Sequence, residues 1–281
     1  MACLIIGTPR ARALPDRRAL AAFFARLKGA GSRGGGGGGG GSAGAFAVTA
    51  DGESDTRGTY TVLAAASALG VLTPALRAGC AAFLAACQGA EGGFGGEPGN
   101  EAHGGYTYCA LAALDILRRS EGGGGGLAAQ GVDAAALQHW LARRQMASEG
   151  GFSGRCNKLV DACYSFWLGA SCVLAARGSS GGGGGGLSAA PAAPAPAPGP
   201  AQLYILAAAQ LPGGRGGCRD KPGKAPDFYH TCYALAGLSV AVWEGGGGGG
   251  GGRGEEVKAA LQGRLFPTDC VYNVRPERLL L

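Results

Sequence analysis

Two short segments of this chain carry side chains that could bind a metal ion together. Residues 154–167 (GRCNKLVDACYSFW) contain a carboxylate and a thiol, Asp161 and Cys163, and residues 227–233 (DFYHTCY) add the imidazole of His230. Oxygen, sulfur and nitrogen ligands of this kind suit zinc. Three protein ligands leave the fourth position open, which is typical of catalytic zinc rather than structural zinc. The two segments therefore predict a catalytic zinc site.

Two cations, Arg155 and Lys158, lie just before the predicted ligand pair. They could hold a polyanion such as a phosphate leaving group, because guanidinium and ammonium groups bind phosphate oxygens. A metal that deprotonates a thiol, next to a site that holds phosphate, predicts transfer of a group onto sulfur. The simpler interpretation of the two cations is a solvated turn.

The spacing of the ligands requires a particular backbone. Asp161 and Cys163 are two residues apart, and such residues do not share one face of a regular helix. They can converge on one ion only where a helix begins. An aspartate at that place is also a good N-cap, and a single cysteine more often belongs to a core, so each residue alone has a simpler explanation.

The composition is that of a globular protein with 281 residues, enough for one large domain or two small ones. The net charge of +6 comes without a run of Lys and Arg interleaved with aromatics, so no nucleic acid is expected as a partner. The sequence has no run of 18 or more apolar residues, so no membrane span is expected. Five cysteines lie among small apolar residues, which favours free, buried thiols. These are Cys80, Cys87, Cys109, Cys172 and Cys232. Free thiols are typical of a reducing compartment, so the cytoplasm is the expected location.

Four segments align with one another without gaps, and each has the pattern of a small-residue-rich apolar helix. They are residues 56–69, 104–117, 161–174 and 229–242, which start 48, 57 and 68 residues apart. His230 is one position past the equivalent of Asp161, which places both at the same end of their helices. Gly-rich turns precede these helices, and second helices are expected over residues 74–87, 133–146 and 202–210.

This repetition predicts an all-α fold of helical hairpins, which stack as an open solenoid or close into an α/α barrel. The whole chain, 1–281, is expected to be one domain. Low-complexity inserts rich in Gly, Ala and Pro are expected to be disordered surface loops. They cover residues 34–41, 122–126, 178–200 and 245–252. None has the strand–GxGxxG–helix context of a nucleotide-binding loop.

Three long stretches closely resemble the β subunits of protein farnesyltransferases. They are residues 91–114 (EGGFGGEPGNEAHGGYTYCALAAL), 144–167 (RQMASEGGFSGRCNKLVDACYSFW) and 220–239 (DKPGKAPDFYHTCYALAGLS). The resemblance implies an α/α barrel that works as a heterodimer with a helical-repeat α subunit. It also implies transfer of a farnesyl group from farnesyl diphosphate to the cysteine of a C-terminal CaaX sequence. The upstream helices of the family, about the first third, have no counterpart here, so an incomplete barrel is expected.

The resemblance assigns roles to individual residues. Asp161, Cys163 and His230 match the zinc ligands, which bind one ion per chain. The resemblance also leaves open a Mg²⁺ ion bound with the diphosphate. Residues matching the diphosphate site are His103, Arg155, Lys158 and Tyr164. Tyr60, Tyr106, Cys109 and Trp167 match the lipid cavity, although core packing explains Tyr60 and Cys109 nearly as well. Arg57 matches a residue near the lipid and the peptide C-terminus, and Tyr229 a residue on the peptide side. Further predicted substrate contacts are Gly104, Gly105, Cys156, Asn157, Ser165 and Phe166.

Three alternatives stay open on sequence alone. Geranylgeranyl-transferring β subunits share the ligand set, and only features such as Cys156, Leu159 and the DKPG…DFYHTCY pattern favour farnesyl. A truncated barrel that keeps its ligands without catalysis is the second alternative. Terpene-cyclase-like α/α barrels are disfavoured, because the chain has no DDxxD or DxDD run. The CaaX substrates, and whether the barrel closes, stay undetermined.

Overall fold

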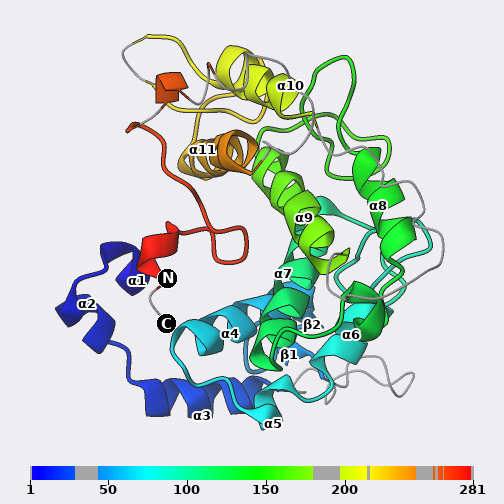
Figure 1. Ribbon diagram of the computed structural model, residues 1–281, viewed down its shortest axis with the longest axis vertical. Helices are drawn as coiled ribbons and strands as arrows, with labels where there is room; N and C mark the ends of the chain where they lie inside the picture. The colour runs from blue at the N-terminus through cyan, green and yellow to red at the C-terminus, as the bar shows by residue number, and fades with distance from the viewer. Residues whose placement is uncertain are drawn as a thin grey trace.

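Helices make up nearly all regular structure in the computed structural model of the chain (Figure 1). The model describes residues 2–28, 44–179, 197–213, 216–244, 256, 259–261 and 263–279. The α-helices are α1 (Ala2–Ile6), α2 (Pro9–Ala13), α3 (Arg17–Leu27), α4 (Thr56–Ala68), α5 (Pro74–Arg77), α6 (Cys80–Ala86), α7 (Gly104–Ser120), α8 (Ala134–Ala142), α9 (Tyr164–Ser179), α10 (Pro198–Leu203) and α11 (Phe228–Trp243). A π-helix (Tyr204–Ala209) continues α10, and 3-10 turns cover Leu127–Gln130 and Pro276–Arg278. Two short antiparallel strands, β1 (Phe46–Ala47) and β2 (Ser54–Asp55), precede α4.

The longest helices form two layers of an arc. The inner layer is α4, α7, α9 and α11, in which each helix packs on the next, and α3, α6, α8 and α10 pack on their outer sides (Figure 1). These are the successive helical hairpins of an α/α barrel, as the repeats predict. Small side chains allow the close approach. A Cβ atom on Gly237 of α11 would lie 2.5 Å from the Cβ of Ser165 on α9.

A segment near the C-terminus joins the ends of this arc. Ser239 Oγ on α11 donates to the carbonyl of Phe266 at 2.7 Å, and Tyr272 Oη donates to Ser67 Oγ on α4 at 2.9 Å. Figure 1 shows this red segment passing beside α11 into the space enclosed by the arc. In the described ranges no extensive contact joins α11 to α4 directly. Residues 266–274 therefore fill the space between the first and last inner helices.

The turns before the inner helices set the register of the repeats. Isolated antiparallel bridges recur at the same place in each unit: Lys28 with Phe46, Gln88 with Phe94, Gln145 with Phe152, and Gln210 with Cys218. The second residues of these pairs are 48, 58 and 66 residues apart, whereas the gapless alignment gave 48, 57 and 68. The alignment was wrong by one residue in the third and fourth units, because the bridges and not the apolar pattern fix the register.

Several expected boundaries differ from the observed ones. The helix expected over residues 74–87 is two helices, α5 and α6, because Gly79 between them takes a left-handed φ of 75°. The insert expected at 178–200 is shorter, since Gly178 belongs to α9 and Pro198 begins α10. Residues 122–126 form a surface loop, but it is ordered, since Arg118 Nη1 donates to the carbonyl of Gly123 at 2.8 Å. The inserts at 34–41 and 245–252 lie outside the described residues.

The cysteines are all free thiols. Cys80, Cys87 and Cys109 are buried as expected, and Cys172 is partly buried. The prediction for Cys232 was wrong, because this residue is on the exposed side of α11. Among the described residues no helix is long and apolar enough to cross a membrane.

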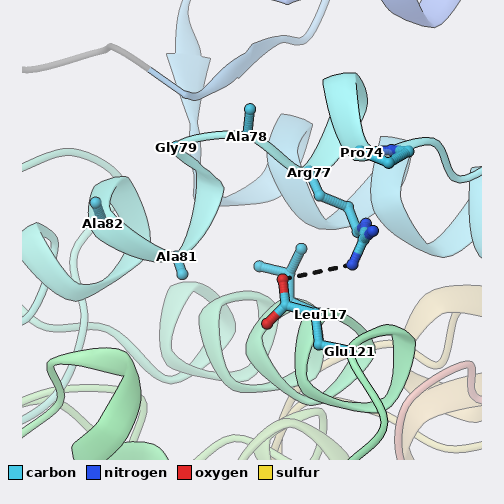
Figure 2. Close-up of a pocket in the computed structure, with 8 residues that line it drawn as sticks. All are labelled: Pro74, Arg77, Ala78, Gly79, Ala81, Ala82, Leu117 and Glu121. Carbon is cyan, nitrogen blue, oxygen red and sulfur yellow. Dashed lines mark hydrogen bonds and ion pairs between the residues drawn. The ribbon is translucent and has the colours of Figure 1, made fainter.

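A pocket of about 400 Å³ opens between α5, α6 and α7 (Figure 2). Half of its lining residues are alanine or glycine, and an Arg77–Glu121 ion pair of 3.4 Å lies at one side. None of the residues predicted to do chemistry lines this pocket. The candidate site therefore lies elsewhere.

Candidate metal centre and substrate site

The predicted zinc ligands meet in space. One ligand atom each from Asp161, Cys163 and His230 lies within 4.8 Å of the other two. Zinc holds O, N and S ligands at about 2.0–2.3 Å in a tetrahedral arrangement, so ligand atoms around one ion lie about 3.3–3.6 Å apart. Side-chain movements of about 1 Å would bring the observed cluster to that arrangement. The donor set and its geometry therefore fit a zinc ion with an open fourth position.

The chain turns just before α9, and this turn aims two ligands at one point. The helix begins at Tyr164, three residues after Asp161. Asp161 Oδ1 accepts the backbone N–H of Cys163 at 2.8 Å, which closes the turn. Asp161 therefore belongs to a turn before the helix. This is the non-helical backbone that the two-residue spacing demands.

His230 is oriented by its neighbour Asp227. Asp227 caps the N-terminus of α11, where its Oδ1 accepts the N–H of His230 at 2.7 Å. Its other oxygen is 2.6 Å from His230 Nδ1, and hydrogen bonds from His230 lower the pKa of the Asp227 carboxyl. A carboxylate at this place holds the imidazole proton on Nδ1. His230 Nε2 faces Asp161 Oδ1, 3.5 Å away, and is the ring nitrogen placed to bind a metal ion.

Cys163 is a buried thiol that needs a cation to ionise. Burial raises its pKa, and the nearby Asp161 carboxylate raises it further. The Tyr229 hydroxyl interacts with Cys163 and lowers its pKa. Tyr229 Oη also accepts the indole N–H of Trp167 at 3.1 Å, which leaves its own proton available for the sulfur.

The Asp227 contact gives a testable prediction for metal affinity. Asp227→Asn should weaken zinc binding about 10- to 100-fold, because the carboxylate that orients the ligand imidazole is lost. Asparagine still caps a helix, so α11 should stay folded. Competition with a chelator measures the affinity. Asp133→Asn is the matched control, because Asp133 caps α8 in the same way without a histidine contact. Equal zinc affinity in both variants would contradict the assigned role of Asp227.

A second cluster of polar side chains begins at Tyr164. Tyr164 Oη and His103 Nε2 are 2.9 Å apart, and His103 Nδ1 accepts the N–H of Gly105 at 3.1 Å. Burial lowers the pKa of His103, and Arg155 lowers it further, so the ring is neutral. Because Nδ1 is an acceptor, the proton lies on Nε2, which donates to Tyr164 Oη. The hydroxyl proton of Tyr164 is then free to donate to an anion.

Arg155 and Lys158 supply positive charge beside this pair. Arg155 Nη1 forms an ion pair of 3.1 Å with Glu101, and both side chains are about half exposed. Lys158 is exposed, and in the described part of the chain its ammonium has no hydrogen-bond or ion-pair partner. Asn157 between them takes a left-handed φ of 56° and is exposed. The loop thus presents two cations: Lys158, which is unpaired in the described part of the chain, and Arg155, whose partner Glu101 an anionic ligand can replace.

Close packing around glycines positions Tyr164. Its ring passes directly over Gly154, where a Cβ atom would lie 2.0 Å from Tyr164 Cζ. A Cβ on Gly104 would lie 3.0 Å from the same ring. Gly105 donates its N–H to His103. These glycines fix the ring beside the histidine.

Aromatic rings continue from the metal centre along the inner helices. Trp167 lies 4.2 Å from Tyr233 and 5.0 Å from Tyr108 between ring centroids. Tyr60 follows, 5.5 Å from Tyr108, and both hydroxyls donate to the carbonyl of Val271. Such a row of rings forms an apolar wall with fixed geometry.

Other predicted residues lie around this wall. Tyr106 packs on His103, and Arg57 lies over the Tyr106 ring at 5.4 Å while its guanidinium pairs with Asp55 and Glu53. Cys109 is buried on α7, where burial raises its pKa to about 12. Ser165 and Phe166 are buried between helices, so the structure does not bring them to an accessible surface.

Sequence reasoning missed Glu101, Tyr108 and Tyr233. The sequence held a signal for Tyr108, which stands 48 residues after Tyr60, one repeat later. Tyr233 follows Tyr229 by four residues on α11 and so shares its face. No sequence signal pairs Glu101 with Arg155.

Comparisons with known proteins identify a family. The family model of the prenyltransferase alpha-alpha toroid domain matches residues 1–274. The β subunit of protein farnesyltransferase from Schizosaccharomyces pombe is 43% identical over 202 residues, 72% of this chain and 49% of that protein. The same subunit from Pyricularia oryzae is 37% identical over 255 residues, 86% of this chain and 46% of that protein.

A solved structure supports the fold. Candida albicans protein geranylgeranyltransferase-I, complexed with GGPP, matches with a TM-score of 0.59 and 22% identity, over 84% of this chain and 61% of that one. The chain spans about half the length of the two farnesyltransferase subunits it matches. Because the family model covers nearly the whole chain, the protein belongs to the prenyltransferase α–α toroid family.

Proposed function

We propose that this chain is the β subunit of a zinc-dependent protein farnesyltransferase. It would transfer a farnesyl group from farnesyl diphosphate to the cysteine thiol of CaaX-terminated proteins, as a heterodimer with an α subunit. The observation that carries the proposal is the Asp161–Cys163–His230 cluster, which is adjacent in the chain to the hydroxyl of Tyr164. The farnesyltransferase relatives support it.

Asp161, Cys163 and His230 would hold the zinc ion. When bound, zinc lowers the pKa of a substrate thiol, about 8.5 in a free cysteine, so that the sulfur reacts as a thiolate. Asp227 holds the proton of His230 on Nδ1 and keeps the ligand nitrogen free. Tyr229, whose hydroxyl interacts with Cys163, would contact the peptide substrate.

The diphosphate would lie against Tyr164, Arg155 and Lys158. As the S–C1 bond forms, the C1–O bond breaks and its electron pair leaves with the diphosphate oxygen. Negative charge then grows on the diphosphate, and fixed donors at that place lower the barrier. Burial raises the pKa of the Tyr164 hydroxyl, so it stays protonated and donates at neutral pH. Arg155 would exchange Glu101 for the diphosphate.

The isoprenoid would run along the partly exposed rings of Trp167, Tyr233 and Tyr60, while buried Tyr108 packs against Trp167 and Tyr60. Its apolar chain gains free energy by leaving water for such a wall. A Mg²⁺ ion with the diphosphate belongs to the proposal as a second cation. The free thiols fit a reducing compartment, so we place the enzyme in the cytoplasm.

One assay tests the proposal and its alternatives. The chain is co-expressed with a farnesyltransferase α subunit, and transfer of labelled farnesyl or geranylgeranyl diphosphate to a CaaX peptide is measured with and without zinc. Zinc-dependent farnesyl transfer is the expected result. Preferred geranylgeranyl transfer would change the assigned lipid. Zinc bound without any transfer would indicate a non-catalytic barrel and contradict the proposal.

The free cation at Lys158 gives a second prediction. Lys158→Ala should raise the KM for the diphosphate substrate about 10- to 100-fold, because a charge-assisted contact contributes about 1.5–3 kcal/mol. Zinc content should not change, since Lys158 lies outside the ligand set. Arg143→Ala, which removes another exposed cation just after α8, is the control. An unchanged KM in Lys158→Ala would assign Lys158 to a solvated turn.

A further inference from the structure

The loop that carries Arg155 and Lys158 has few attachments to the rest of the fold. An antiparallel bridge between Ser153 and Val160 closes its base. Among the described residues, no backbone hydrogen bond ties residues 155–159 to another element. Gly154, directly before Arg155, is held by its carbonyl, which accepts the N–H of Gly104 at 2.8 Å. Beyond Gly154, the described contacts of residues 155–159 with the rest of the fold are made by side chains.

Two side chains of the loop make such attachments. Arg155 pairs with Glu101 at 3.1 Å, at a half-exposed position. Cys156 Sγ donates to Glu91 Oε2 at 3.2 Å and accepts from Arg144 Nη2 at 3.6 Å. When Arg155 turns to a diphosphate, its bond to Glu101 is given up. Cys156 is then the remaining side-chain attachment of the loop in the described part of the chain.

Arg144 is a rigid anchor for this thiol. The residue is only 6% exposed, and its carbonyl accepts the N–H of Ser153 at 2.8 Å. Its guanidinium lies over the Trp140 ring at 5.1 Å. In the described ranges no carboxylate pairs with it, and two of its nitrogens, Nε and Nη1, are buried without partners. Burying a charged group with few hydrogen-bond partners costs free energy. The contact with Cys156 is one of the few that the Arg144 guanidinium makes, so it is a specific feature of the site.

We propose that Cys156 is a positioning residue for the diphosphate site. Its thiol accepts a hydrogen bond from Arg144 and donates one to Glu91. These two hydrogen bonds hold the loop, and with it Arg155 and Lys158, where the diphosphate binds. This inference rests on the proposed function. It also changes the role expected from the sequence, because the Cys156 thiol contacts Arg144 and Glu91 rather than standing free for substrate. A reagent that alkylates this partly exposed thiol would break both contacts.

The test compares two substitutions in the complex with the α subunit. Cys156→Ser keeps a hydroxyl that both donates and accepts, whereas Cys156→Ala removes both roles. Binding of farnesyl diphosphate and of inorganic diphosphate is measured by calorimetry, with zinc content in parallel. Cys156→Ala should weaken both affinities about 10-fold or more, as expected for hydrogen bonds to charged groups. Cys156→Ser should bind within about threefold of the unchanged protein, and Arg144→Gln should behave like Cys156→Ala. Cys232→Ser, at an exposed thiol of α11, is the control.

The outcomes separate the inference from the proposed function. If the unchanged protein binds neither compound, the proposed function is overturned, and the inference with it. If it binds both and Cys156→Ala binds equally well, the inference alone is overturned. Equal losses in the Ser and Ala variants would overturn it too, because shape rather than hydrogen bonding would then matter. Loss of zinc in Cys156→Ala would show a general structural role and also contradict it.

Discussion

Cys163→Ala is expected to remove bound zinc and prenyl transfer together. Cys163 supplies the sulfur ligand of a three-residue cluster, and two ligands with two open positions hold zinc poorly. Even residues that only orient a ligand contribute about 10- to 100-fold to metal affinity or activity, so loss of the ligand itself should exceed about 100-fold. Metal analysis of the purified complex and the transfer assay measure the two effects.

Cys232→Ala is the matched control for this experiment. Cys232 lies on α11 two residues after His230, but its side chain is exposed and outside the cluster. This variant should keep one zinc per chain and its activity. Retained transfer in Cys163→Ala, with zinc absent, would remove the metal from the mechanism.

Gly154→Ala is expected to disable the diphosphate site while leaving the metal site intact. A Cβ atom at residue 154 would lie 2.0 Å from Tyr164 Cζ and 2.3 Å from Tyr164 Oη, so the ring must move away. Gly154 has no left-handed φ, so alanine fits the backbone itself. Misplacing a catalytic group by about 1 Å can cost about 100-fold in rate. Steady-state kinetics should show a loss of that order in kcat/KM.

Two comparison variants separate the ring position from the hydroxyl. Gly124→Ala, in an exposed loop with open space around the glycine, should leave kinetics unchanged. Tyr164→Phe removes the hydroxyl without moving the ring, and its loss should be smaller than that of Gly154→Ala. Zinc content near one per chain in every variant shows that the protein is folded. Unchanged kcat/KM in Gly154→Ala would mean that Tyr164 takes no part in catalysis.

Local patterns in the sequence were sufficient for the inner helices. The apolar, small-residue stretches at 56–69, 104–117 and 229–242 predicted the starts of α4, α7 and α11 to within one residue, although α7 continues to Ser120. Helix boundaries that depend on a single backbone torsion were harder. The break at Gly79 and the late start of α9 at Tyr164 come from a left-handed glycine and from a turn held by Asp161.

The metal ligands were predictable because their chemistry is carried by residue type and spacing. The two-residue spacing of Asp161 and Cys163 excluded a regular helix, and the repeats placed His230 near the start of the next inner helix, although the bridges align Asp161 with Asp227 rather than with Tyr229. Neighbours that come from other repeats were not predictable in this way. Glu101 and Arg155 are far apart in sequence, and their contact exists only because the turns before α7 and α9 lie side by side.

The sequence by itself determined the all-α repeat, the ligand set and the two cations, because these follow from side-chain chemistry and periodicity along the chain. Only the tertiary structure decided where each side chain points. Cys156 turns toward Arg144 and Glu91, and Tyr108 and Tyr233 complete the row of rings. The physical reason is that these contacts join different repeats. Their geometry depends on how the inner helices pack, and no local pattern of residues encodes that packing.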